Sequence, residues 1–302
     1  MADIPSTEDV NPSTVDLDRL STKEMLHRIN DEDRRAAAAV ERELDALAAA
    51  VDAVADRLSS SGRLYYFGAG TSGRIAAADA AELPPTFGVP SEMVVAHIAG
   101  GDAALSRSVE GAEDDADAGR LAVENAHLGK GDAALALSAS GSAPFALGAL
   151  RAAREAGVVT IAIVNADRSP LAEIADLPIV LRTGAEAIAG STRMKAAAAQ
   201  KMALTAFSTA VMVRLGRTHG NLMAGATPSN AKLRRRALRT TIAVTGADEL
   251  AASRALESSG YDVRIASVML VARCDRREAE RMLARADGSL RRALDEIEKR
   301  TR

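Results

Sequence analysis

Apolar positions along the chain change their spacing in a regular way, and each spacing predicts one kind of element. Between residues 40 and 58 they recur every three or four residues, on one face of a helix, at Val40, Leu44, Leu47, Val51, Val54 and Leu58. The segment 59–62 (SSSG) closes this long N-terminal helix. A second helix-forming run extends from about Thr192 to Leu215 and is long enough to cross a domain.

Short, almost wholly apolar runs alternate with the helical segments. They predict strands at 64–67, 93–98, 133–137, 158–164 and 178–181. Because strands that are apolar on both sides are typical of covered sheets, we expect an α/β fold with a doubly wound parallel sheet. After residue 240 the strand pattern ends, and short helices are expected at 247–259, 262–272, 276–286 and 289–298. The sequence therefore predicts two domains, residues 1–239 with an N-terminal helical arm and residues 240–302 as a small helical bundle.

Composition and charge narrow the function classes. A formal net charge of −3 and an aromatic content of 2% argue against nucleic acid as a partner, because both a positive field and stacking rings are lacking. The single cysteine, Cys274, excludes an internal disulfide. Residues 1–18 are polar and acidic, unlike a signal peptide, and no apolar run approaches the roughly 18 residues of a membrane span. We therefore expect a cytoplasmic protein that does not contact membranes, with residues 1–15 disordered.

Three turns rich in glycine and hydroxyl side chains precede predicted helices. Such a turn points backbone N–H groups outward at the positive end of the helix dipole, where phosphate binds. The residues expected to bind phosphate are Gly70, Thr71, Ser72 and Gly73 in the first turn, Ser138, Ser140, Gly141 and Ser142 in the second, and Ser191, Thr192 and Lys195 in the third. The first turn has dinucleotide-motif spacing, but the segment 84–88 (PPTFG), about 20 residues on, lacks the acidic residue that an NAD site needs. The turns therefore predict a site for another phosphorylated ligand.

Six motifs in order along the chain resemble one family. They are 68–74 (GAGTSGR), 79–88 (DAAELPPTFG), 99–102 (AGGD), 109–114 (VEGAED), 190–195 (GSTRMK) and 220–223 (GNLM). The chain resembles the N-acetylmuramic acid 6-phosphate etherases, which are sugar isomerase (SIS) domain proteins. The resemblance implies a SIS domain, a homodimer, no metal or organic cofactor, and hydrolysis of the lactyl ether of a phosphorylated amino sugar to N-acetylglucosamine 6-phosphate and D-lactate. The four histidines also lack metal-ligand spacing.

The resemblance assigns two glutamates to catalysis. Glu82 takes the place of the acid that helps lactate leave, and Glu113 that of the second acid–base residue. We expect the helix after Gly73 to end near Glu82, at the Leu-Pro-Pro segment that follows it. Nine helical residues rise about 13 Å, too far for one hexose phosphate to reach from Gly73 to Glu82. Either the chain bends after Asp79, or Glu82 serves the site of the partner subunit.

The sequence is compatible with two other functions. One is a non-catalytic phosphosugar sensor resembling the glucokinase regulatory protein, against which the presence of both Glu82 and Glu113 argues. The other is an aldose–ketose isomerase, which needs a base but no acid for a leaving group. Release of D-lactate from N-acetylmuramic acid 6-phosphate distinguishes the etherase from both.

Overall fold

The computed structural model describes residues 6–226, 228 and 230–301. The chain forms two compact units, one of Met1–Ala80 with Glu92–Ser208 and the other of Ala81–Ser91 with Thr209–Arg302. The boundary predicted between residues 239 and 240 falls inside one continuous helix, α9 (Ala231–Thr245). The last strand of the sheet ends at Val180, and the chain changes packing partners within α8 (Lys195–Arg214), between Ser208 and Thr209, so neither event falls at residue 240.

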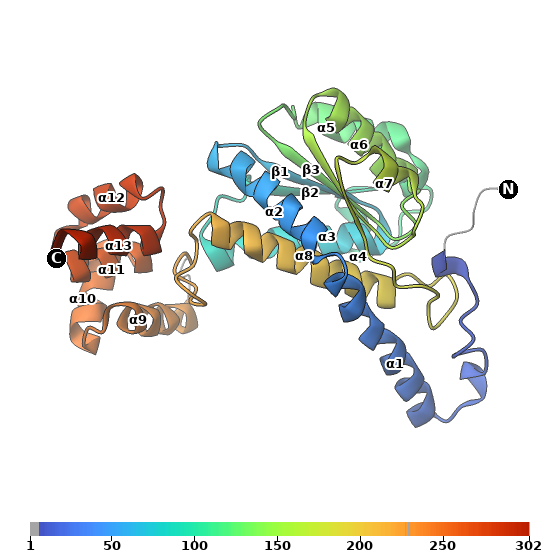
Figure 1. Cartoon of the computed structure of the whole chain (residues 1–302), viewed down its shortest axis with the longest axis horizontal. Helices are drawn as coiled ribbons and strands as arrows, with labels where there is room; N and C mark the ends of the chain where they lie inside the picture. Colours follow the sequence, from blue (N-terminus) through green and yellow to red (C-terminus); the bar gives the residue numbers. More distant parts are fainter. Residues whose placement is uncertain (1–5, 227, 229, 302) are drawn as a thin grey trace. The chain divides into compact units, whose positions relative to one another are not determined.

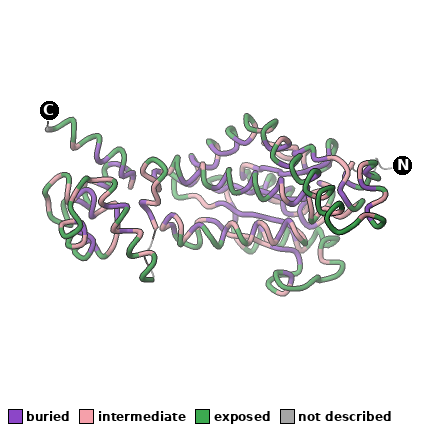
Figure 2. Tube along the Cα trace, turned by 90° about the horizontal axis from the view of Figure 1, so that it is seen from below, coloured by how far each residue is buried: buried purple, intermediate pink, exposed green. Residues whose placement is uncertain are grey.

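The first unit is built on five parallel strands, and all five were predicted. They are β1 (Leu64–Gly68), β2 (Val94–Ile98), β3 (Ala133–Ser138), β4 (Val159–Val164) and β5 (Leu177–Val180). Their order is β2-β1-β3-β4-β5, with Gly68 paired to Ile98 on one side and to Leu137 on the other. Every residue of β1 and β3 is buried, which is the burial expected of a sheet covered on both faces (Figure 2).

Helices cover both faces of the sheet (Figure 1). One face carries α5 (Ala116–Asn125), α6 (Pro144–Glu155) and α7 (Pro170–Ile174). The other carries α2 (Leu44–Ser59) and the first parts of α3 (Gly70–Phe87) and α8 (Lys195–Arg214). The expected doubly wound α/β fold is therefore confirmed. Two short helices, α4 (Ala103–Ser106) and the 3₁₀ turn η3 (Ala112–Asp114), lie between β2 and α5.

The predicted end of α3 at Leu-Pro-Pro is wrong. The helix continues through Pro84 and Pro85 to Phe87, where the N–H of Gly88 bonds to the carbonyl of Pro84 (2.9 Å). Leu83 and Phe87 are buried on either side of the two prolines, so packing holds this last turn although each proline lacks an N–H donor. The helix is also continuous through Asp79, where a bend was one expectation.

The N-terminal segment is ordered from Ser6 onward, so the predicted disorder is wrong for residues 6–15 and otherwise falls outside the described residues. Two 3₁₀ turns, η1 (Ser6–Glu8) and η2 (Leu17–Arg19), lead into α1 (Thr22–Glu41). Helix α1 begins at a capping box in which Ser21 and Glu24 exchange hydrogen bonds. The predicted N-terminal helix is thus divided, because Val40 belongs to α1 and α2 starts at Leu44.

Four of the five helices in the C-terminal part of the second unit match the predicted helices closely. After α9 they are α10 (Glu249–Ser259), α11 (Val263–Ala272), α12 (Arg276–Arg285) and α13 (Leu290–Thr301). Asp248, Asp262 and Asp275 cap the N-termini of α10, α11 and α12 through their side chains. Helix α8 has the length and hydropathy to cross a membrane, contrary to expectation, but 56% of its apolar window is buried inside the structure, as in the core helix of a globular fold.

Candidate active site

The turns that follow β1 and β3 meet at the point where the strand order reverses. From β1 the chain continues to β2 on one side of the sheet, whereas β3 leads to β4 and β5 on the other side. In open parallel sheets ligands bind at this position, beyond the carboxyl ends of the strands. The sequence places its first two hydroxyl-rich turns there, before α3 and before α6.

A cavity of about 510 Å³ lies at this edge of the sheet, and we call it the turn cavity. Residues of all three predicted phosphate turns line it together with Glu113. The predicted site residues in its wall are Gly70, Thr71, Ser72, Ser138, Ser140, Ser142, Thr192 and Glu113. Five others, Gly73, Glu82, Gly141, Ser191 and Lys195, are not among its lining residues. The structure thus brings most of the predicted residues to one cavity, and the positions of Gly73, Gly141 and Lys195 have clear structural reasons.

The turn between β3 and α6 is shaped by its own serine side chains. The hydroxyl of Ser138 accepts a hydrogen bond from the N–H of Gly141 (3.0 Å), and that of Ser140 accepts from the N–H of Ser142 (3.2 Å). Gly141 has a φ of +67°, and a Cβ there would lie 2.3 Å from the Ser169 side chain. Gly141 therefore allows the turn to form. The N-cap residue of α6, Ala143, makes no side-chain cap, which leaves the N-terminal N–H groups of α6 available to an anion.

Behind the turn between β1 and α3 lies a buried polar chain. The Ser72 hydroxyl donates to Gln200 Oε1 (2.8 Å), and Gln200 Nε2 donates to Asn165 Oδ1 (3.0 Å). Asn165 in turn donates to the carbonyl of Leu181 (3.2 Å) and to the hydroxyl of Thr183 (3.3 Å). The chain joins the start of α3 to α8 and to the end of β4, so the first turn is fixed from behind.

Gly73 serves the same turn by packing. A Cβ at this position would lie 2.5 Å from Ile98 Cγ1 and 2.7 Å from the carbonyl oxygen of Gly68. Only glycine lets α3 start this close to the ends of β1 and β2. Gly73 therefore allows the turn to pack against the sheet, and its phosphate contact stays a prediction.

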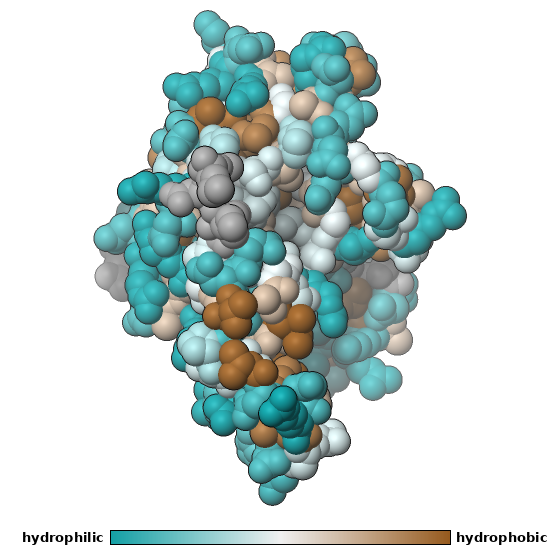
Figure 3. Space-filling view, turned by 90° about the vertical axis from the view of Figure 1, so that its right-hand side faces the viewer, coloured by the Kyte–Doolittle hydropathy of each residue, from teal (hydrophilic) through white to brown (hydrophobic). Residues whose placement is uncertain are grey.

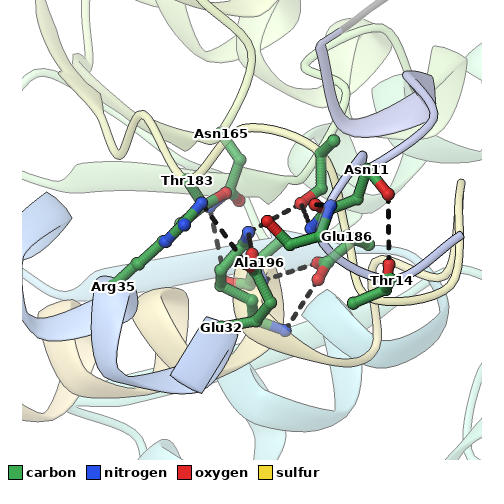
Figure 4. A network of polar contacts seen from close by, with 11 residues as sticks. Asn11, Thr14, Glu32, Arg35, Asn165, Thr183, Glu186 and Ala196 are labelled. Atoms are coloured by element: carbon green, nitrogen blue, oxygen red, sulfur yellow. Dashed lines mark hydrogen bonds and ion pairs between the residues drawn. The ribbon is translucent and has the colours of Figure 1, made fainter. Parts of the chain in front are cut away.

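The prediction that Lys195 binds phosphate does not fit its position, because its side chain belongs to a buried polar network. Figure 4 shows this network, with Glu32 and Glu186 among its members. The side chain of Lys195 is 1% exposed, and Nζ lies 2.6 Å from Glu32 Oε2 and 2.6 Å from the carbonyl oxygen of Ala185. The charge of Lys195 is therefore already paired inside the protein.

The N-terminus of α8 is also occupied, because Glu186 accepts hydrogen bonds from the N–H groups of Lys195 (3.0 Å) and Ala196 (2.8 Å). Burial raises the pKa of Glu186 above its ordinary value, although these two donors oppose the shift. The third turn therefore offers Thr192 and Gly190 to the cavity, but neither a cation nor a free helix end.

One carboxylate in the turn cavity was not anticipated. Glu8, in η1, lines the cavity, and its Oε2 lies 2.5 Å from where a Cβ would stand on Gly190. The segment around it is held to the third turn, since the N–H of Gly190 bonds to the carbonyl of Thr7 (3.2 Å) and Asn11 Nδ2 bonds to that of Ala185 (3.3 Å). Its polar composition suggested disorder, and no local pattern in the sequence marks a segment that is held by such distant partners.

A second cavity of about 310 Å³ adjoins the first, and we call it the side cavity. The two share four lining residues, Ala69, Gly70, Glu113 and Asp114. Glu113, on η3, is exposed and belongs to both walls. Glu82 is also exposed and lies on α3 in the segment assigned to the second unit. Among the residues that the structure describes, no group of three His, Cys, Asp or Glu is arranged to hold a metal ion.

Comparison with known proteins identifies the family. The chain is 44% identical over 288 residues to the N-acetylmuramic acid 6-phosphate etherase of Caldanaerobacter subterraneus, covering 95% of this chain and 94% of the relative. It is 46% identical to the enzyme of that name from Serratia proteamaculans, covering 95% and 97%. The chain belongs to the N-acetylmuramic acid 6-phosphate etherase family. The resemblance inferred from the six motifs is thereby confirmed.

Two family models place the SIS domain in this etherase-family chain. Residues 46–154 match the glucokinase regulatory protein N-terminal SIS domain, and residues 115–224 match the SIS domain. The fold is also similar to that of a phosphoheptose isomerase from Francisella tularensis, with 19% identity, a TM-score of 0.52, and coverage of 64% of this chain and 98% of that one. These matches span the sheet and the turns that line both cavities.

Proposed function

We propose that the protein cleaves the D-lactyl ether of N-acetylmuramic acid 6-phosphate, giving N-acetylglucosamine 6-phosphate and D-lactate. The observation that carries this proposal is the 44–46% identity to etherases over 95% of the chain. The site agrees with it, because hydroxyl-rich turns at two helix N-termini suit a phosphate ester and Glu113 lies in the same cavity.

The reaction proceeds through an elimination and an addition. In the ring-opened sugar the C2–H bond lies beside the C1 aldehyde, so a base can remove that proton while the C3–O bond breaks. An acid protonates the ether oxygen, so that lactate leaves with a free hydroxyl group, and a C2=C3 double bond remains in the sugar. Water then adds its hydroxyl to C3 and a proton returns to C2, so the net change is consumption of one water. The enzyme is accordingly a carbon–oxygen lyase, and in D₂O the product should carry one deuterium at C2.

Glu113 and Glu82 share the proton transfers in this proposal. Glu82 protonates the leaving lactate and Glu113 acts as the second acid–base residue, each step contributing on the order of 10²–10⁴-fold in rate. A glutamate that donates a proton near neutral pH needs burial or a neighbouring negative charge to raise its pKa. Both side chains are exposed in the single chain, so the substrate or a second subunit must supply that burial.

We propose that Glu82 works in the site of the partner subunit of a homodimer. The support is the length of α3, which continues without interruption from the phosphate turn past Glu82. Large apolar side chains exposed near the N-terminus, Val10, Val15 and Leu26, provide surface for a second copy, and Figure 3 shows apolar residues gathered on one face. Mixing Glu82→Ala and Ser140→Ala chains, each inactive alone, should restore activity in mixed dimers; exchange of subunits without recovered activity would rule out the shared site.

The decisive experiment incubates the purified protein with N-acetylmuramic acid 6-phosphate and measures D-lactate with a D-lactate dehydrogenase. Glu113→Gln is the matched variant, since it keeps the side-chain volume while removing the acid. Lactate release that this variant abolishes supports the etherase. Binding of the substrate without turnover would instead indicate a sensor, and conversion of an unsubstituted sugar phosphate between aldose and ketose would indicate an isomerase.

A further inference from the structure

Two cavities of different volume meet at Glu113. The turn cavity, of about 510 Å³, carries the hydroxyl-rich turns, whereas the side cavity, of about 310 Å³, is lined partly by the segment between β2 and α5. A ligand that occupies both must pass the shared wall formed in part by Gly70 and Glu113. Glu113 would then face the middle of the ligand, between the part in one cavity and the part in the other.

The charges in the side cavity are unevenly distributed. Among its described lining residues Arg74 is the one cation, and Glu110, Glu113 and Asp114 are acidic. Arg74 lies one helical turn after Gly70 on α3, and it is half-buried. Its Nη2 donates to the carbonyl oxygen of Arg107 (3.1 Å), which orients the guanidinium group. A fixed guanidinium with further N–H donors suits a planar carboxylate, which it can bind through two parallel hydrogen bonds.

We propose that Arg74 binds the carboxylate of the lactyl group and thereby selects substrates that carry a 3-O-lactyl substituent. This inference rests on the proposed function and adds to it the orientation of the substrate: the phosphate lies in the turn cavity, the lactyl group in the side cavity, and the C2 and C3 carbons between them near Glu113. The three acidic residues repel a free anion from the side cavity, so a monoanion is retained there only through Arg74. Ser108 donates to Glu110 Oε1 (2.8 Å), which holds one of these acids in place.

The test uses two substrates that differ only at the carboxylate. One is N-acetylmuramic acid 6-phosphate, and the other is its lactyl amide, which has the same shape and no charge. The wild-type protein should cleave the acid with a kcat/KM about 100-fold higher than the amide, the size expected for a charge-assisted hydrogen bond to a partly buried group. Arg74→Met should lose most of this factor on the acid while changing the amide reaction by less than about threefold. Arg74→Lys keeps the positive charge but loses the two parallel N–H donors of the guanidinium group. Its preference for the acid over the amide should lie between those of the wild type and Arg74→Met.

The control is Arg107→Met, because this neighbouring arginine is exposed and its side chain does not line the side cavity. It should leave the acid-to-amide ratio unchanged. Equal losses on both substrates in Arg74→Met, or no preference in the wild type, would overturn the role of Arg74 while leaving the etherase activity established. If the wild-type protein cleaves neither ether, the proposed function fails first, so the two failures are distinguishable.

Discussion

Breaking the buried ion pair between Lys195 and Glu32 should destabilise the first unit strongly. The two side chains are 1% and 3% exposed, and the Nζ–Oε2 distance is 2.6 Å. Replacing Lys195 with methionine leaves the Glu32 carboxylate buried, with Arg35 3.3 Å away as its remaining ion-pair partner. Removing one member of such a pair costs about 3–5 kcal/mol in the free energy of unfolding, because an uncompensated charge stays in the interior. The double variant Lys195→Met/Glu32→Gln should lose clearly less than the sum of the two single variants.

Urea denaturation followed by circular dichroism measures the four free energies of this cycle. Burial raises the pKa of Glu32, but the hydrogen bond and charge of Lys195, with Asn11 and Arg35, outweigh it and hold the pKa below its ordinary value. The stabilisation by the pair is therefore complete above the pKa of an unfolded glutamate and is lost as the pH falls through the lower folded value. The reasoning is refuted if Lys195→Met costs less than about 1 kcal/mol and weakens phosphate binding instead.

Three further outcomes are expected. Burial raises the pKa of Asp79 to about 6, although hydrogen bonds from Ser208 and Tyr66 oppose the shift. The protonated form is favoured in the fold, so the free energy of unfolding relative to Asp79→Asn should fall by about 3 kcal/mol as the pH rises from 4 to 6 and then stay level, which pH-dependent urea titrations check. Gln200→Leu leaves the buried Ser72 hydroxyl without its acceptor and Asn165 Oδ1 without the donor Nε2, and it should cost about 1–3 kcal/mol in the same assay. Glu8→Gln removes a negative charge from the turn cavity and should tighten the binding of inorganic phosphate about threefold in calorimetry, while Glu8→Asp should not.

The sheet was predictable because its signal is local. Each strand is buried on both sides, so its apolar run stands out against the polar turns, and the alternation with helices fixes the parallel direction. The position of the site followed from the same logic, since glycine- and serine-rich turns after β1 and β3 must meet at one edge of the sheet. What the local pattern missed was the end of α3, where burial of Leu83 and Phe87 overrides the two prolines between them.

The errors around the third turn have a different cause. A lysine three residues after a hydroxyl-rich turn is typical of a phosphate site, and nothing within the motif reveals that its charge is already neutralised. Its partner, Glu32, lies 163 residues away in α1, and the carbonyl of Ala185 completes the pocket for the ammonium group. The same carbonyl accepts a hydrogen bond from Asn11, which helps to hold the N-terminal segment whose Glu8 lines the cavity. Lys195 therefore affects the ligand through the structure that it holds, which is why its loss should appear first in the free energy of unfolding.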